Sequence, residues 1–359
     1  MSTTANVPSP VQMVAASFTT PRLPLSVGPR PVAQVAPGQI LVRVEAAGVC
    51  GSDVHIWHGN VPVRQTPIVL GHEIAGVIAE SGSETAPWKP GDRVIVRAAS
   101  GCGACARCRE GEDNLCPNQT VLGMDCDGGF AQYVLTPAAN LVPLPVEIPF
   151  ETGAILTDAV ATPYHALTAR GQLKPGESVV IFGCGGLGTH AVQLARLLGA
   201  AVVVAVDVRP AALDRARSLG ADASIDSREE AAHKAVQRLT AGGADLALDF
   251  VGRPDTTSQA VRCLRPGGRL VIVGMGQEPI NLPPPALFAW REHAALGSFG
   301  STRRDVDEVI GLVQSGRLDL SGSVTGRFPL SAINEALETL ERGESDHVRL
   351  VIAPWEGGA

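Results

Sequence analysis

A strand, a glycine-rich turn and a helix follow one another in the middle of this chain, and no other stretch constrains its fold more. SVVIFG (178–183) is a short apolar run of strand length, and GCGGLG (183–188) then matches the pattern G-x-G-x-x-G. THAVQLARLLGA (189–200) has apolar residues at helical spacing, with Gly199 as its expected C-cap. A glycine-rich turn in this context is typical of a parallel sheet that binds a dinucleotide.

The glycines of the turn have different expected roles. Gly183 permits the tight turn, Gly185 lets the backbone approach a pyrophosphate, and Gly188 allows close helix–strand packing. Asp207 ends the next apolar segment, AVVVAVD, nineteen residues after Gly188. A carboxylate there accepts hydrogen bonds from a ribose 2′-OH and repels a 2′-phosphate. We therefore expect NAD(H) in preference to NADP(H), with Arg209 partly offsetting the discrimination.

At 359 residues the chain is long enough for two domains. From about residue 160, strands alternate with helices, which predicts a parallel, doubly wound sheet. Before about residue 155 the segments are short, β-rich and separated by Gly and Pro, which predicts an antiparallel, barrel-like body. The final segment ends in HVRLVIAP (347–354), which we expect to pack back onto that body.

Individual elements are expected from the same patterns. In the antiparallel body the expected strands are 40–50, 72–82, 92–99 and 130–137. In the parallel sheet they are 178–183, 201–207, 244–252 and 268–276, with a helix over 210–221 and another between the last two strands.

Four of the eight cysteines crowd into GCGACARCREGEDNLC (101–116) with the spacing C-x2-C-x2-C-x7-C. The four are Cys102, Cys105, Cys108 and Cys116. Such spacing lets thiolates converge on one zinc ion, although some iron–sulfur proteins use similar spacings. Four protein ligands leave zinc no open position, so we expect a structural site.

A second group of residues suits a metal site with an open position. Cys50 ends one expected strand and His72 begins another. Polar residues crowd beside them at Ser52, Asp53, His55 and Glu73. A catalytic zinc usually takes three protein ligands and an exchangeable water. Asp158 is our candidate for the third ligand, although spacing alone does not select it.

The net charge of −7 and the pI near 5.6 argue against nucleic acid or an anionic membrane as a partner. No apolar run reaches the roughly 18–20 residues needed to cross a bilayer. MSTTANVPSPVQMVAASF at the N-terminus shows no signal-peptide pattern, so we expect a soluble, cytoplasmic protein.

The GHE element (71–73), the four-cysteine segment, the GCGGLG turn and their order together resemble the zinc-dependent medium-chain alcohol dehydrogenase family, from about residue 12 to 354. The resemblance implies an α/β plus β fold, in which a Rossmann domain (161–298) is inserted into a GroES-like catalytic domain. The catalytic domain would comprise 1–160 and 299–359, with the structural-zinc lobe at about 98–118. It also implies a homodimer or homotetramer, with 293–300 as the associating sheet edge.

Carried over by position, the resemblance implies catalytic zinc on Cys50, His72 and Asp158, with Glu73 approaching the metal. Asp53 would orient the histidine ligand, unless it only forms a turn. Many relatives have Cys at the third ligand position, and Asp there resembles bacterial branches that act on secondary alcohols or small aldehydes.

The resemblance also implies a proton relay and contacts for the cofactor. Ser52 would take the substrate proton and pass it through the cofactor ribose to His55, while His58 would be only a surface neighbour. The implied cofactor contacts, besides those already named, are Thr162, Gly186, Leu187, Val273 and Arg349. Gly51 stands where some relatives have a basic residue near the pyrophosphate.

The expected function is hydride transfer between an alcohol and NAD, with zinc lowering the pKa of the alcohol. Trp57 is expected at the mouth of the substrate pocket or as a core anchor. Ala98 replaces a bulky aromatic of relatives, which favours a bulky or secondary alcohol. A polyol or sugar dehydrogenase, an aldehyde dismutase and a biosynthetic dehydrogenase stay open. A zinc-ribbon protein with a nucleotide-sensing domain and no catalysis is the alternative from another class.

Overall fold

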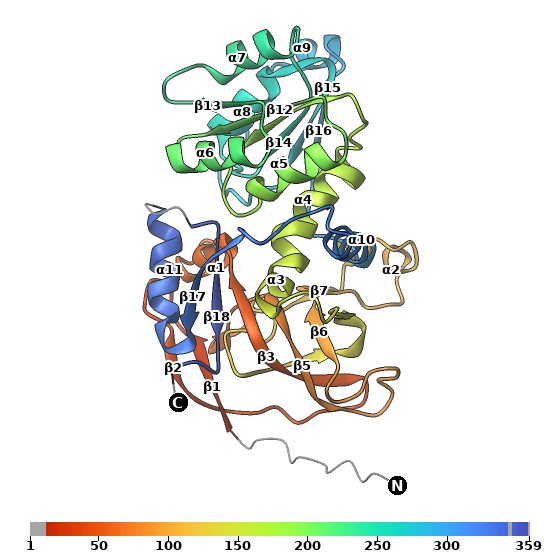
Figure 1. Ribbon diagram of the computed structural model, residues 1–359, viewed down its shortest axis with the longest axis vertical. Coiled ribbons are helices and arrows are strands. Elements are labelled where there is room, and N and C mark those ends of the chain that lie inside the picture. Colours follow the sequence, from red (N-terminus) through yellow and green to blue (C-terminus); the bar gives the residue numbers. More distant parts are fainter. Residues whose placement is uncertain (1–11, 344–346, 358–359) are drawn as a thin grey trace.

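The computed structural model describes residues 12–343 and 347–357, which form two large sheets with a cavity between them (Figure 1). The predicted combination of a parallel doubly wound sheet and an antiparallel body is confirmed. Residues 1–11 lie outside the described residues, and so does much of the segment examined for a signal peptide.

Six parallel strands form the upper sheet of Figure 1, in the order β13-β12-β11-β14-β15-β16. Alternate residues of β11 face opposite sides, so that Val179 and Ile181 pack with α5 and α6 while Val180 and Phe182 pack with α7 and α8. The strands are β11 (Ser178–Phe182), β12 (Val202–Asp207), β13 (Ala223–Asp226), β14 (Ala244–Asp249), β15 (Leu264–Ile272) and β16 (Ala294–Gly297). The helices are α5 (Gly188–Leu197), α6 (Pro210–Ser218), α7 (Ala232–Leu239), α8 (Pro254–Arg262) and α9 (Pro285–Trp290).

The second large sheet has the order β10-β6-β5-β3-β18-β17, with β9 also paired to β3. Its strands are β3 (Gln39–Val49), β5 (Glu73–Ser81), β6 (Arg93–Val96), β9 (Tyr133–Pro137), β10 (Leu141–Pro143), β17 (Val324–Pro329) and β18 (Arg349–Ala353). β18 pairs antiparallel with β3, so the end of the chain returns to the sheet built by its beginning. β6 is shorter than expected and ends at Val96, although the Arg97 N–H still donates to Asn140 O in register with the pairing of Val96 and Leu141.

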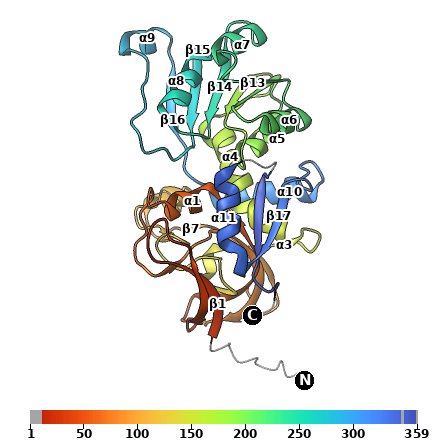
Figure 2. The same cartoon turned by 90° about the vertical axis from the view of Figure 1, so that its left-hand side faces the viewer.

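Smaller elements complete this half of the molecule. The sheet β2-β1-β4 contains β1 (Gln12–Phe18), β2 (Ser26–Pro31) and β4 (Ile68–Val69), and β7 (Ala99–Ser100) pairs with β8 (Thr120–Val121). The helices are α1 (Gly51–Trp57), α2 (Ala106–Arg109), α10 (Arg303–Gln314) and α11 (Ile333–Arg342), with 3-10 turns η1 (Asp113–Leu115), η2 (Ala138–Asn140) and η5 (Leu330–Ala332). α11 packs beside β17 and β18 (Figure 2).

One unbroken helical run connects the two halves of the molecule (Figure 1). It consists of α3 (Phe150–Ile155), the π-helical η3 (Leu156–Val160), α4 (Ala161–His165) and the π-helical η4 (Ala166–Arg170). Its apolar side chains join the core cluster that also contains residues of both large sheets. Among the described helices, none has the length and apolar character needed to cross a membrane.

Candidate functional site

A cavity of about 600 Å³ lies where the two halves of the molecule meet. The turns after β11, β12, β14 and β15 line one side of it, and the ends of β3 and β5 with helix α1 line the other. Ligands of open parallel sheets bind at the carboxyl ends of the strands, and this volume lies in the range of small-molecule sites.

The glycine-rich turn forms one wall of the cavity. Gly183 has φ = +83°, a backbone conformation that glycine adopts readily. A Cβ atom on Gly188 would lie 1.9 Å from the Gly183 carbonyl oxygen, so a side chain there would push α5 away from β11. Gly185 and Leu187 also line the cavity, at the N-terminus of α5.

Asp207 ends β12 at the edge of the cavity and is almost completely buried. Its carboxylate accepts hydrogen bonds from the Cys184 N–H (2.7 Å) and the Arg209 N–H (2.9 Å), and Arg209 Nε lies 3.2 Å away. Burial opposes ionisation, but the hydrogen bonds and charge of Arg209 hold the pKa of Asp207 below its usual value. The site therefore offers an anionic acceptor whose charge Arg209 partly compensates.

The predicted metal ligands of the second group come together at the end of the antiparallel sheet. Gly48 pairs with Glu73, so Cys50 after β3 and His72 before β5 lie at the same end. The ligand atoms of Cys50, His72, Glu73 and Asp158 all lie within 4.8 Å of one another. A thiolate, an imidazole and a carboxylate are the donors that zinc accepts, so the site fits this metal.

Asp158 reaches this group from the helical run. It lies in the π-helical segment η3, and its Oδ2 is 3.4 Å from Cys50 Sγ and 3.6 Å from His72 Nε2. Thr162, one turn later, donates a 2.7 Å hydrogen bond to Asp158 Oδ1. Burial opposes ionisation, but the hydrogen bond and charge of His72 hold the pKa of Asp158 well below its usual value. π-Helical turns occur frequently at functional sites.

Asp53 lies beneath the ligands and is fully buried. Its carboxylate accepts the Cys50 N–H (2.9 Å) and the Gly71 N–H (3.2 Å), and its Oδ1 is 3.5 Å from His72 Nδ1. Burial opposes protonation of His72, but Asp53 and Asp158 raise its pKa well above the usual value. Asp53 therefore ties both ligand-bearing loops together, in the position of a carboxylate that orients a metal-bound histidine.

Glu73 and Arg349 form a buried ion pair behind the ligands, with Oε1 and Nη2 3.2 Å apart. Burial raises the pKa of Glu73 to about 8, against the opposing charge of Arg349. The Arg349 guanidinium also lies against Gly186, where an added Cβ would be 2.9 Å from its Cζ. Arg349 thus connects the metal-site half of the cavity to the glycine-rich turn.

Ser52 and His55 lie on α1 and line the same cavity. Ser52 Oγ is 3.3 Å from His72 Nε2, beside the candidate metal ligands. Burial, and then the charge of His58, lowers the pKa of His55. His58 does not line the cavity, and its Nε2 lies 2.8 Å from a carboxylate oxygen of Glu341 in α11.

The expectation that Trp57 lies at the pocket mouth is wrong. Its ring packs in the core of the antiparallel half, its Nε1–H donates to Leu23 O (2.8 Å), and it does not line the cavity. Ala98 and Val273 do line the cavity, as do apolar side chains that the sequence did not single out. These additional side chains include Val54, Val121, Met124 and Phe299. Single apolar residues on separate loops carry no sequence signal that distinguishes residues lining a cavity from residues of the core.

The four clustered cysteines converge on one point outside the cavity. Cys105 Sγ lies 3.5 Å from Cys108 Sγ and 3.8 Å from Cys116 Sγ, and all eight cysteines are unpaired. Four thiolates bound to zinc at about 2.3 Å in a tetrahedron lie about 3.8 Å apart. The geometry therefore fits a single tetrahedral ion, and a disulfide would require about 2.05 Å.

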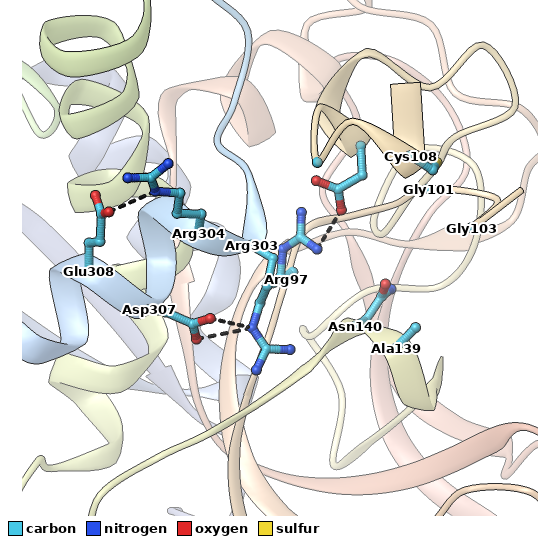
Figure 3. A pocket seen from close by; sticks show the side chains of 12 residues that line it. Arg97, Gly101, Gly103, Cys108, Ala139, Asn140, Arg303, Arg304, Asp307 and Glu308 are labelled. Carbon is cyan, nitrogen blue, oxygen red and sulfur yellow. Dashed lines mark hydrogen bonds and ion pairs between the residues drawn. The ribbon is translucent and has the colours of Figure 1, made fainter. Parts of the chain in front are cut away.

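A second, open cavity of about 630 Å³ separates this cysteine lobe from α10 (Figure 3). Its three arginines are paired: Arg97 with Asp113 (2.6 Å), Arg303 with Asp307 (3.0 Å) and Arg304 with Glu308 (2.8 Å). The cavity is thus nearly neutral. Arg97 also lines the first cavity, so its pair with Asp113 anchors the lobe beside that cavity.

Comparison with known proteins gives concordant matches. Residues 36–146 match the family described as alcohol dehydrogenase GroES-like domain, and residues 186–315 match the family described as zinc-binding dehydrogenase. An alcohol dehydrogenase from Rhizobium meliloti (strain 1021) is 37% identical over 330 residues, which are 90% of this chain and 94% of that protein.

Two solved structures resemble the whole fold and carry nucleotides. Acetophenone reductase from Geotrichum candidum NBRC 4597, in complex with NAD, has a TM-score of 0.86 and 32% identity and covers 97% of this chain and 99% of that one. A zinc-binding dehydrogenase from Sinorhizobium meliloti 1021, bound to NADP, has a TM-score of 0.86 and 30% identity, with 96% and 99% covered.

Proposed function

Because the chain belongs to the zinc-dependent medium-chain dehydrogenase family, we propose that it oxidises a secondary or bulky alcohol to the ketone or aldehyde with NAD, or catalyses the reverse. One observation carries the proposal. A single cavity contains both the glycine-rich turn with Asp207 and the convergent Cys50, His72 and Asp158.

Two groups would supply the reactive chemistry when bound: a zinc ion would provide a Lewis acid for the substrate oxygen, and a nicotinamide would provide the hydride acceptor. Cys50, His72 and Asp158 would hold the catalytic ion, with Glu73 behind them. A second ion, which would stabilise the lobe, would be held by Cys102, Cys105, Cys108 and Cys116.

Ser52 and His55 serve as the proton path. Ser52 Oγ lies beside His72 at the candidate metal site, so it can accept a proton from a substrate hydroxyl held there. His55 is only half-buried and has a lowered pKa, so it is largely neutral at neutral pH and can take up this proton near the cavity edge.

NAD is the proposed cofactor because Asp207 presents an ionised carboxylate where a 2′-phosphate would otherwise bind. Arg209 already bonds this carboxylate, which moderates the discrimination. Thr162, Val273, Leu187 and Arg349 line the remainder of the proposed cofactor path.

The apolar wall made by Ala98, Val121, Met124 and Phe299 supports an alcohol with apolar substituents. A polyol would leave hydroxyl groups facing this wall without partners, at a cost in binding free energy. The solved acetophenone reductase has a name that implies a substrate of this apolar class.

We also propose a homodimer or homotetramer of the proposed dehydrogenase. β16 is the outermost strand of the parallel sheet and pairs within the described chain only with β15, so its other edge is available to a second copy.

Turnover of an alcohol panel tests the function directly. The purified protein with bound zinc is assayed for NADH formation with 1-phenylethanol, 2-butanol, ethanol and sorbitol, and with NADP in place of NAD. We expect the highest kcat/KM with 1-phenylethanol and NAD, and loss of turnover with a chelator. Nucleotide binding without turnover of any substrate would instead favour the zinc-ribbon protein with a nucleotide-sensing domain. A higher kcat/KM with sorbitol would favour the polyol dehydrogenase.

A further inference from the structure

His190 lies in the first turn of α5 and is completely buried, yet no step of the proposed reaction uses it. α5 is the helix that follows the glycine-rich turn, and it lies on the side of the parallel sheet that faces the rest of the chain (Figure 1). The imidazole therefore occupies the junction between the two halves of the molecule.

One ring nitrogen holds the glycine-rich turn. His190 Nδ1 lies 2.7 Å from the carbonyl oxygen of Gly186, and a carbonyl can only accept, so Nδ1 carries the proton. A trans peptide is planar, with its C=O and N–H pointing in opposite directions. Drawing the Gly186 oxygen toward α5 therefore turns the N–H of Leu187 the other way. Leu187 lines the cavity at the N-terminus of α5, where backbone N–H groups bind phosphate.

The other ring nitrogen holds the antiparallel half. His190 Nε2 lies 3.0 Å from the hydroxyl oxygen of buried Ser323, which directly precedes β17. Gln193, on the same face of α5, donates to Asp319 O (3.0 Å). The segment 319–323 is thus bonded to the helix that begins at the cofactor turn.

The ionisation state of His190 matches these partners. Burial, and then the charge of Arg349, lowers the pKa of His190 to about 3. A neutral imidazole has one donor and one acceptor, so Nδ1–H donates to Gly186 and Nε2 accepts the Ser323 hydroxyl proton. Neither nitrogen is left for proton transfer with substrate.

We infer that His190 is a positioning residue, which holds the Gly186–Leu187 peptide so that its N–H faces the phosphates of the bound dinucleotide. The inference rests on the proposed function, since it assigns a task within that cofactor site. It predicts that the affinity for the dinucleotide depends on the hydrogen bond between His190 and Gly186, and not on the contribution of His190 to the stability of the fold.

Two amide variants separate these contributions. In His190→Asn, the amide nitrogen occupies the place of Nδ1 and keeps the bond to Gly186, but the side chain is too short for Ser323. In His190→Gln, the amide group lies near the place of Nε2 and keeps the Ser323 bond, but not the Gly186 bond. Each variant loses one buried hydrogen bond, so both should lose thermal stability to a similar degree.

The Kd for NADH, measured by fluorescence titration of the zinc-loaded protein, is the main readout. We expect the Kd of His190→Asn within about twofold of the parent and that of His190→Gln raised about tenfold, as one lost buried bond permits. The KM for NAD should rise likewise in His190→Gln, with kcat at saturating NAD and zinc content unchanged. Ser323→Ala should leave the Kd within about twofold, because the Gly186 bond remains.

The result that overturns the inference alone is equal NADH affinity in His190→Asn and His190→Gln while the parent binds NADH and oxidises alcohols. A parent that binds no dinucleotide overturns the proposed function, and this inference with it.

Discussion

At the scale of single residues, Gly51 is the position where one side chain could most simply change cofactor affinity. It begins α1 at the cavity, and an added Cβ would meet no atom within 4 Å. We expect Gly51→Arg to lower the Kd for NADH about tenfold, since arginine makes charge-assisted bonds to phosphate. Fluorescence titration measures this, with Gly51→Gln as an uncharged control. An unchanged or weaker affinity in Gly51→Arg would contradict the prediction.

Ala98 is the residue whose size should set the width of the substrate pocket. Ala98→Phe adds a ring to the apolar wall and should reduce kcat/KM for 1-phenylethanol by at least about tenfold, while ethanol changes little, because only the bulky alcohol needs that space. Ala98→Val should give an intermediate ratio. If both alcohols lost activity equally, Ala98 would not control substrate size.

The residues of the site differ in how far the sequence could identify them. Cys50 and His72 follow and precede paired strands, so strand pattern and residue chemistry together point to them. Asp158 meets them only through the packing of the helical run, which no local spacing encodes. Trp57 illustrates the opposite error, in which a residue is wrongly assigned to the site. An aromatic residue close in sequence to site residues can equally well pack in the core, as Trp57 does.

At the scale of elements, the start of α10 is held by a buried cluster. Thr302 is the N-cap, and its N–H donates to Asp305 Oδ2 (2.7 Å) while its hydroxyl accepts from the Asp305 N–H (3.3 Å). His165 of α4 bonds the same carboxylate through Nδ1 (2.8 Å). The Asp305 side chain therefore takes part in the N-terminal cap of α10 and bonds this helix to the helical run that carries Asp158.

Replacing Asp305 should weaken this junction measurably. We expect Asp305→Ala to lower the free energy of unfolding by about 1–3 kcal/mol, because it removes a cap and leaves buried donors unpaired. Chemical denaturation at pH 7 measures the loss. Thr302→Ser, which keeps the capping hydroxyl, should change stability far less, and equal losses would argue against the capping role.

The same carboxyl gives a pH dependence of known sign. Burial opposes its ionisation, but the hydrogen bonds of His165 and Thr302 hold the pKa of Asp305 below its usual value. A group with a lowered folded-state pKa stabilises the fold above its unfolded pKa of about 3.9 and stops doing so as the pH falls through the folded value. The stability difference between parent and Asp305→Asn should therefore shrink as the pH falls below about 4. A difference that grows on acidification would contradict the assignment.

Helices and strands with a clear hydrophobic period were predictable from the sequence, whereas elements that form only through contacts with neighbouring elements were not. The alternation in β3 and the helical period of α5 are local properties of the chain. β13 has four residues and depends on pairing with β12. The π-helical turns η3 and η4 depend on packing between the two halves, so the sequence did not indicate them.

At the scale of the whole molecule, the two metal centres should be separable. Cys50→Ala is expected to lose one zinc and all turnover but to stay folded, because its site lines the cavity. Cys105→Ala is expected to lose the other zinc together with thermal stability, since structural zinc contributes folding energy. Metal analysis and thermal unfolding of both variants check this. If Cys105→Ala kept the parent's stability while losing turnover, the lobe would serve catalysis directly.

The order of the strands along the chain also has a consequence for protein synthesis. β18 lies between β3 and β17 in the finished sheet, but about three hundred residues separate its sequence from β3. While the ribosome makes the parallel sheet, β9 can already pair with the first half of β3, but residues 47–49 at its end lack their partner strand, and the arginine that faces Glu73 has not been translated. The half that contains the parallel sheet can fold during translation, whereas the antiparallel half must wait for β18 before its sheet is complete.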